Sequence, residues 1–210
     1  TVATQPAGQF CTVANGSGTV GAAAVDSVAV SCLDTHSVGV TVTGLAGSGL
    51  VLQNNDGDDL AVNTNGDFTF SAPIAEGSLY AVTVLTEPTS PKQTCTVSGG
   101  SGTMGGADVT GIQVTCANKT YSIQVTVSGL AGSGLVLQNN GDTLPVGTDG
   151  DHTFATKVAD QGGYAVVVSS EPSNPNQTCT VTGGSGTVDG ADVTGIAVDC
   201  VTNTYPVSVT

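Results

Sequence analysis

The fold is decided by the segment QTCTVSGGSGTMGGADVTGIQVTC at residues 93–116, which recurs with few changes as QTCTVTGGSGTVDGADVTGIAVDC at residues 177–200. A more divergent copy lies at residues 9–32. Each copy holds two cysteines 21 residues apart, and successive copies are 84 residues apart. An internal repeat of fixed period is the mark of a tandem array of similar structural units.

The repeat extends beyond the cysteines, because GLAGSGLVLQNN at residues 44–55 recurs at residues 129–140. The predicted segments are 1–32, the C-terminal part of a repeat; 33–116 and 117–200, two complete repeats; and 201–210, the first strand of another repeat. The two partial segments together are shorter than one repeat. We therefore expect the natural chain to continue in both directions.

Each repeat alternates apolar and small polar residues, as half-buried β-strands do. Thirty Gly and eight Pro supply turns, and Asn65-Gly66 predicts a hairpin. About seven short strands in a unit of this length is typical of a β-sandwich. We therefore predict an all-β chain of seven-stranded sandwich domains. The residues expected to face the core of the first complete repeat are Val38, Val40, Val42, Leu50, Leu52, Leu60, Val62, Phe68, Phe70, Tyr80, Val82, Val84, Ile112 and Val114.

The cysteine pairing follows from the repeat and from strand parity. Cys95 and Cys116 share the inward parity of Val97 and Val114, so their side chains can meet inside the sandwich. The predicted disulfides are Cys11–Cys32, Cys95–Cys116 and Cys179–Cys200. Metal binding is the weaker alternative, because the chain has no CxxC motif and no partnered histidine.

The predicted disulfides have two consequences. Closing a loop of this size stabilises a domain by about 3 kcal/mol, which offsets a small core without Trp. Disulfides also require an oxidising compartment, so we expect an extracellular or cell-surface location.

Two sets of residues carry a resemblance to a known class. The pattern L-x-V-x-x-N-G-D-F-T-F at residues 60–70, followed by Gly77 and YAVTV at residues 80–84, resembles immunoglobulin-like and prealbumin-like sandwich modules of large bacterial surface proteins. GLAGSGLVLQNN and the cysteine-bearing segment are similar to repeats of long secreted bacterial proteins. The resemblance implies Ig-like domains in a fibre, stalk or adhesin. Some such modules carry a Lys–Asn isopeptide bond, but no lysine recurs between these repeats.

The charge balance excludes several partners. Three basic residues stand against 17 acidic ones, a net charge of −14. Nucleic acids are bound through clustered Lys and Arg, so we expect no nucleic-acid partner. No run is apolar and long enough to cross a bilayer, so we expect no membrane insertion.

Catalytic signals are weak. GSGTVG at residues 16–21 and GSGTMG at residues 100–105 match the dinucleotide pattern G-x-G-x-x-G, but a nucleotide site needs a helix after it. We interpret each segment as a glycine-rich hairpin between strands. His36 and His152 are replaced by Tyr121 and Phe68 in the other repeat, so neither belongs to a recurrent triad, and His152 is expected at a sandwich edge. We expect no enzyme activity.

The acidic turns are the only candidates for a cofactor. Carboxylates in such turns can ligate Ca²⁺, although Asn, Asp and Gly also form turns without a metal, which is the favoured interpretation. No cofactor is firmly predicted. The calcium candidates are Asp56, Asp58, Asp59, Asp149 and Asp151.

Composition and repeats together point to a structural role. We expect a segment of an extracellular filament, sheath or surface stalk, with self-association between copies of the chain. The alternative is an adhesin module that binds carbohydrate or a partner protein through loops or an edge strand. Glycans are possible partners, since Asn15, Asn118 and Asn176 begin N-x-Ser/Thr patterns.

Overall fold

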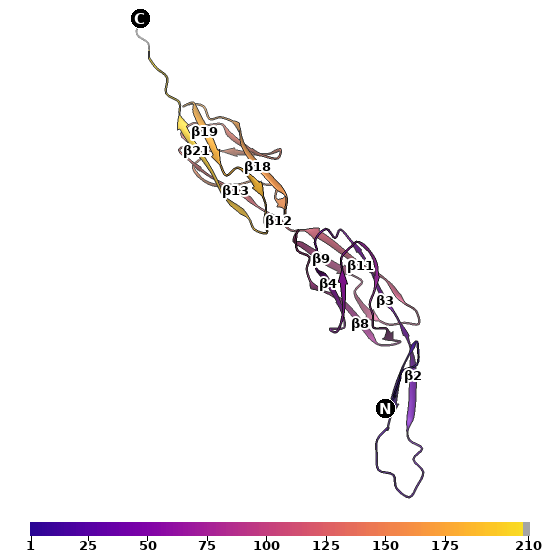
Figure 1. The fold of residues 1–210 in the computed structure, drawn as a ribbon. Coiled ribbons are helices and arrows are strands. Elements are labelled where there is room, and N and C mark those ends of the chain that lie inside the picture. The colour runs from indigo at the N-terminus through magenta and orange to yellow at the C-terminus, as the bar shows by residue number, and fades with distance from the viewer. Residues whose placement is uncertain (208–210) are drawn as a thin grey trace. The chain divides into compact units, whose positions relative to one another are not determined.

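The computed structural model describes residues 1–207, and this part of the chain contains strands but no helix. The all-β class is confirmed. The chain divides into two compact units, Thr1–Thr89 with Gln93–Ala117 and Ser90–Lys92 with Asn118–Thr210. Each unit holds one complete repeat, and the first also holds the N-terminal hairpin (Figure 1).

The first complete repeat is a β-sandwich. Its strands are β3 (Val38–Thr43), β4 (Leu50–Asn54), β5 (Asp58–Val62), β6 (Gly66–Thr69), β7 (Ile74–Ala75), β8 (Leu79–Thr86), β9 (Gln93–Ser98), β10 (Ser101–Thr103) and β11 (Val109–Asn118). One sheet has the order β6-β3-β11-β9 and the other β10-β8-β4-β5. Side chains from both sheets meet in a single hydrophobic core.

Most core residues are those that the alternation predicts, but the core also contains Leu45 and Met104, which it does not predict. Val38, Val40 and Val42 are at most 2% exposed, and Leu50 and Leu52 of the opposite sheet are at most 1% exposed. β-Branched side chains fill such pleated surfaces well, which explains why Val dominates here. Phe70 is buried and Phe68 packs against the core from its edge.

The second complete repeat has the same architecture. Its strands are β12 (Thr120–Tyr121), β13 (Ile123–Ser128), β14 (Leu135–Asn139), β15 (Asp142–Val146), β16 (Gly150–Thr153), β17 (Val158–Ala159), β18 (Gly163–Ser170), β19 (Gln177–Thr182), β20 (Ser185–Thr187) and β21 (Val193–Thr202). The sheet orders are β16-β13-β21-β19 and β15-β14-β18-β20. Identical topology follows from near-identical patterning.

The strand count differs from the expected seven, because each repeat places four strands in each of its two main sheets and adds a short strand, β7 or β17, that pairs with β2 or β12 outside them. The additional strand in the main sheets is β10, or β20 in the second repeat, and it comes from the glycine-rich segment interpreted as a hairpin. The hairpin interpretation holds for residues 16–21, which lie in the loop between the antiparallel strands at residues 9–14 and 29–36. It is wrong for the copy at residues 100–105, because β10 pairs with β8 and belongs to a different sheet from β9. Glycine is needed because a Cβ at Gly102 would lie 2.6 Å from the Tyr80 hydroxyl oxygen.

The hairpin predicted at Asn65-Gly66 is also wrong. β5 pairs with β4 and β6 pairs with β3, so this turn carries the chain from one sheet to the other. The Asn65 side chain instead bonds the backbone of Leu45, accepting from its N–H at 2.8 Å and donating to its carbonyl at 3.0 Å. A local turn signal was overridden by tertiary pairing of the flanking strands.

The N-terminal hairpin consists of β1 (Gln9–Ala14) and β2 (Ala29–His36), paired antiparallel with Cys11 opposite Cys32. The end of β2 then pairs with β7 through Thr35 and His36. Only Ser37 separates β2 from β3, so the hairpin strand runs almost directly into the first strand of the complete repeat.

Candidate functional site

All six cysteines are bonded, as Cys11–Cys32, Cys95–Cys116 and Cys179–Cys200. This is the pairing that the repeat predicts. In each complete repeat the bridge joins an edge strand, β9 or β19, to the strand beside it, β11 or β21. Both cysteines are buried in the core. The disulfide therefore covalently links two strands that hydrogen bonds already hold together.

A glutamate that sequence reasoning missed supports the bridge of each complete repeat. Oε2 of Glu87 accepts the N–H of Cys95 at 2.9 Å, and Oε2 of Glu171 accepts the N–H of Cys179 at 2.9 Å. A charged acceptor strengthens such a hydrogen bond. The available signal was the recurrence of a Glu-Pro pair eight residues before each cysteine.

A second missed residue is the glutamine that opens β9 and β19. Gln93 is 1% exposed; its Oε1 accepts from the N–H groups of Ala46 at 2.9 Å and Gly47 at 2.8 Å, and its Nε2 donates to the Gly44 carbonyl at 2.9 Å. Gln177 makes the corresponding bonds in the second repeat. The amide thus fixes the loop that carries the recurrent GLAGSG sequence.

The acidic turn at residues 56–59 is held by hydrogen bonds within its own repeat. Asp58 accepts from the Ser71 hydroxyl at 2.7 Å and from the Ala72 N–H at 2.8 Å. Asp59 accepts from Gln53 Nε2 at 2.6 Å. Asp56 lies in the turn with φ of 55°, a left-handed conformation that Asp tolerates.

The remaining calcium candidates also have structural partners. Asp149 accepts the N–H of Leu130 at 2.8 Å, in the place that Asn65 takes in the first repeat, and Asp151 accepts from the Thr126 hydroxyl at 2.6 Å. No three His, Cys, Asp or Glu side chains gather into a possible metal site within residues 1–207. Asp58, Asp59 and Asp151 lie on strands β5 and β16 and not in the turns themselves, and calcium binding stays a prediction.

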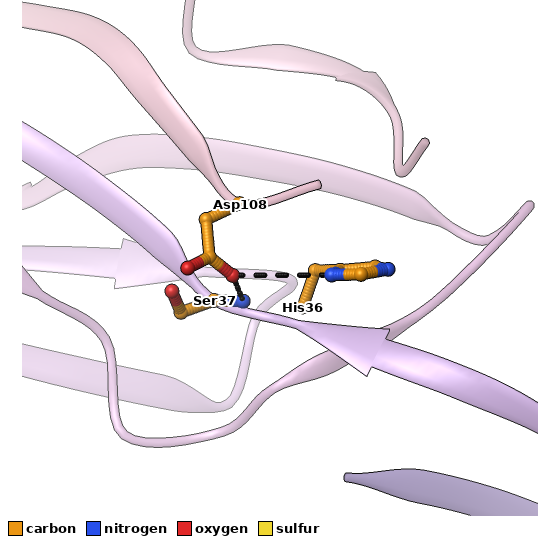
Figure 2. Close-up of polar contacts among 3 residues, drawn as sticks. All are labelled: His36, Ser37 and Asp108. Atoms are coloured by element: carbon orange, nitrogen blue, oxygen red, sulfur yellow. Dashed lines mark hydrogen bonds and ion pairs between the residues drawn. The ribbon is translucent and has the colours of Figure 1, made fainter. Parts of the chain in front are cut away.

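One polar cluster stands where the hairpin meets the first repeat (Figure 2). Oδ1 of Asp108 accepts the N–H of Ser37 at 2.8 Å and lies 4.0 Å from Nδ1 of His36. The Ser37 backbone and side-chain hydrogen bonds lower the pKa of the Asp108 carboxyl below its ordinary 3.8, with a smaller contribution from His36. Asp192 makes the same bond to Ser122 N–H at 2.7 Å, so the aspartate recurs although His36 does not.

This cluster lacks the geometry of a Ser-His-Asp triad. In a triad the histidine presents Nε2 to the serine hydroxyl and Nδ1 to the carboxylate. Here Nδ1 of His36 faces Asp108, but Nε2 is buried and has no hydrogen-bond partner. The recurrent function of Asp108 and Asp192 is to cap the start of the first strand.

His152 lies on β16, an edge strand of its sheet, as expected. Its Nε2 is 2.9 Å from the Thr148 carbonyl oxygen. The predicted glycosylation positions Asn15, Asn118 and Asn176 are all exposed. These asparagines are accessible to modification, and glycosylation remains a prediction.

Comparison with protein-family models and with curated proteins finds no match. The class is therefore defined by the structure: a chain of all-β sandwich repeats, each with one disulfide. No helix of the described residues is long and apolar enough to span a bilayer. The three disulfides fit an extracellular protein.

Proposed function

We propose that this chain is a structural repeat segment of an extracellular filament, sheath or surface stalk. The carrying observation is the direct passage from strand to strand between successive repeats. β2 ends at His36 and β3 begins at Val38; β11 ends at Asn118 and β12 begins at Thr120. Connections of one residue provide no separate linker between repeats, which suits a serial array of repeats.

The roles of the polar side chains support this proposal. The candidate carboxylates and the buried Gln93 and Gln177 bond the backbone of their own repeat. These hydrogen bonds stabilise the backbone of each repeat, which is consistent with a non-catalytic role for the side chains. The resemblance to Ig-like modules of bacterial surface proteins points the same way, as does the oxidising compartment implied by the disulfides.

Negative-stain electron microscopy of the native material tests the proposal, together with sedimentation velocity of the purified chain. Regular filaments, with concentration-dependent association of the chain, would support self-assembly into a fibre. Separate particles at every concentration would overturn the filament and sheath forms and leave the stalk. A catalytic activity lost on substitution of Asp108 and Asp192 would overturn the structural role itself.

An adhesin is the second candidate, favoured by a hollow that recurs beside the first hairpin of each complete repeat. It measures about 340 Å³ near Asn54 and Asp58 and about 660 Å³ near Asn139 and Asp142. Asn54 is 1% exposed and its Nδ2 lacks a hydrogen-bond partner. A glycan array probed with the chain, and again with Asp58→Ala and Asp142→Ala together, would show saccharide binding that the double variant loses.

A further inference from the structure

The last strand of each complete repeat lies beside β3 or β13, the first strand of its four-stranded sheet, and runs parallel to it. β3 pairs with β11 from Val38 opposite Val109 to Thr43 opposite Thr115. β13 pairs with β21 in the same way, from Ile123 opposite Val193 onward. All other strand pairs whose register the structure gives in the described residues are antiparallel, so this pair is distinct in both units.

Parallel pairing puts the entry and the exit of the repeat at opposite ends of the same two strands. The chain enters at the Val38 end of β3 and leaves beyond Thr115 of β11. Tension along the chain therefore pulls the two strands in opposite directions along their own axes. The hydrogen bonds between them are loaded together, in shear, whereas an antiparallel pair of terminal strands would open one bond at a time.

We propose that the β3–β11 and β13–β21 pairs are force-bearing elements, which make each repeat resist tension applied through its two chain ends. The inference concerns the single repeat and does not depend on whether the chain forms a filament. Resistance to pulling is governed by the barrier to unfolding and so by the bonds that must break first.

The entry end of the pair is reinforced by side-chain and backbone bonds. Asp108 accepts the Ser37 N–H at 2.8 Å, and the Ser37 carbonyl accepts the Val109 N–H at 2.9 Å. The second repeat has the same two bonds, Ser122 N–H to Asp192 at 2.7 Å and Val193 N–H to the Ser122 carbonyl at 2.9 Å. These bonds lie where tension first reaches β3 or β13.

At the exit end, β11 is linked covalently to the neighbouring strand β9. Cys116, near the end of β11, is bonded to Cys95 of β9. Tension that leaves through β11 therefore passes to β9 through the disulfide, and the residues between the two cysteines cannot lengthen while the bond is intact. The entry end of the pair is thus reinforced by the hydrogen bonds of Ser37, whereas at the exit end the disulfide couples β11 to β9 and not to β3.

Single-molecule force spectroscopy in two pulling directions tests the proposal on the same protein. The full chain carries attachment points at both termini and at an azide-bearing residue in place of Gly106, in the exposed loop before β11. A side chain is tolerated there, because a Cβ would meet only Glu76 Oε1 at 3.9 Å. Pulling between the termini shears β3 against β11; pulling between the N-terminus and residue 106 loads both strands at the same end and peels them apart.

We expect rupture of the first repeat at a several-fold lower force in the peeling direction, at the same loading rate. Since only the attachment differs, a folding defect cannot produce this result. Equal rupture forces in the two directions would overturn the proposal.

Reduction and substitution locate the two ends of the force-bearing pair. Reducing the disulfide, which spans 21 residues, should add roughly 70 Å to the unfolded length of a repeat. Asp108→Ala should lower the terminal rupture force of the first repeat. Asp58→Ala removes a similar carboxylate–backbone bond in the other sheet and should leave the force unchanged. An equal effect of the two substitutions would show that Asp108 does not reinforce the pair.

Discussion

The N-terminal hairpin and the two complete repeats contain the same sequence pattern in different surroundings. Val30 of β2 is 64% exposed, whereas its counterparts Val114 and Val198 are 0% exposed. Val28 is 48% exposed, against 1% for Ile112 and for Ile196. The hairpin keeps its strand pairing and its disulfide but has no opposing sheet among residues 1–32. The same pattern is therefore exposed where no second sheet lies against it among residues 1–32 and buried where one does.

The largest difference is expected for a charge at the same position in the two environments. Val114→Asp places a carboxylate in a closed core and should lower the free energy of unfolding of the first repeat by about 4 kcal/mol. Val30→Asp should change stability by less than about 0.5 kcal/mol, because its side chain stays in water. Denaturant unfolding with the disulfides intact measures both. A similar loss in the two variants would mean that the hairpin face is covered in solution.

A smaller difference is expected between two glycines that share a left-handed conformation. Gly44 has φ of 72°, and a Cβ there would collide with the Cys116 carbonyl oxygen; Gly8 has φ of 75° and no atom within 4 Å of a Cβ. Gly44→Ala should cost about 3 kcal/mol, from conformation and collision together. Gly8→Ala should cost only the conformational part, about 1 kcal/mol. Thermal unfolding of both variants separates the two contributions, and equal costs would refute the role of the Cys116 contact.

The glutamines at the start of β1 and β9 differ in the same way. Gln93 is buried and bonds three backbone groups of the Gly44–Gly47 loop, whereas Gln9 is exposed and donates to Asp34. Gln93→Ala should cost about 2 kcal/mol, because two N–H groups and a carbonyl lose their partner. Gln9→Ala should be nearly neutral. Hydrogen exchange of the Ala46 and Gly47 amides would report the loss directly, and their unchanged protection would contradict it.

The smallest effect concerns pH and has no counterpart in the hairpin, where Ala24 stands at the position of Asp108. The pKa of the Asp108 carboxyl is below 3.8 in the folded protein because it accepts hydrogen bonds from Ser37. Its contribution to stability is therefore full above pH 3.8 and is lost as the pH falls through the folded-state pKa. An NMR titration of Asp108, with Asp108→Asn unfolded in parallel across this range, checks the sign. A folded-state pKa above 3.8 would refute it.

Much of each repeat could be predicted from short-range pattern. Val38, Val40 and Val42 alternate with polar residues and are buried as expected, and the spacing of Cys95 and Cys116 was enough to pair them. These features depend on periodicity along one strand or on comparison between repeats. They need no knowledge of which strand lies opposite.

The wrong hairpin predictions concern segments whose flanking strands pair with strands distant in the sequence. Asn65-Gly66 has the residues of a tight hairpin, but β6 pairs with β3, which contributes three buried valines to the core. The glycine-rich segment at residues 100–105 contributes β10, with Gly102 opposite Tyr80 of β8, whereas its copy at residues 16–21 lies in the loop of the N-terminal hairpin. Neither outcome can be read from residues adjacent in sequence.

By itself, the sequence determined the class, the period, the disulfides and the apolar face of each strand, because these depend on composition and spacing within short segments. The tertiary structure alone decided the sheet to which each strand belongs, the parallel alignment of β3 with β11, and the assignment of Asp108, Glu87 and Gln93 to particular backbone groups. Hydrogen bonds of those kinds join residues up to 71 positions apart. Their formation depends on the three-dimensional packing that brings such distant residues within reach.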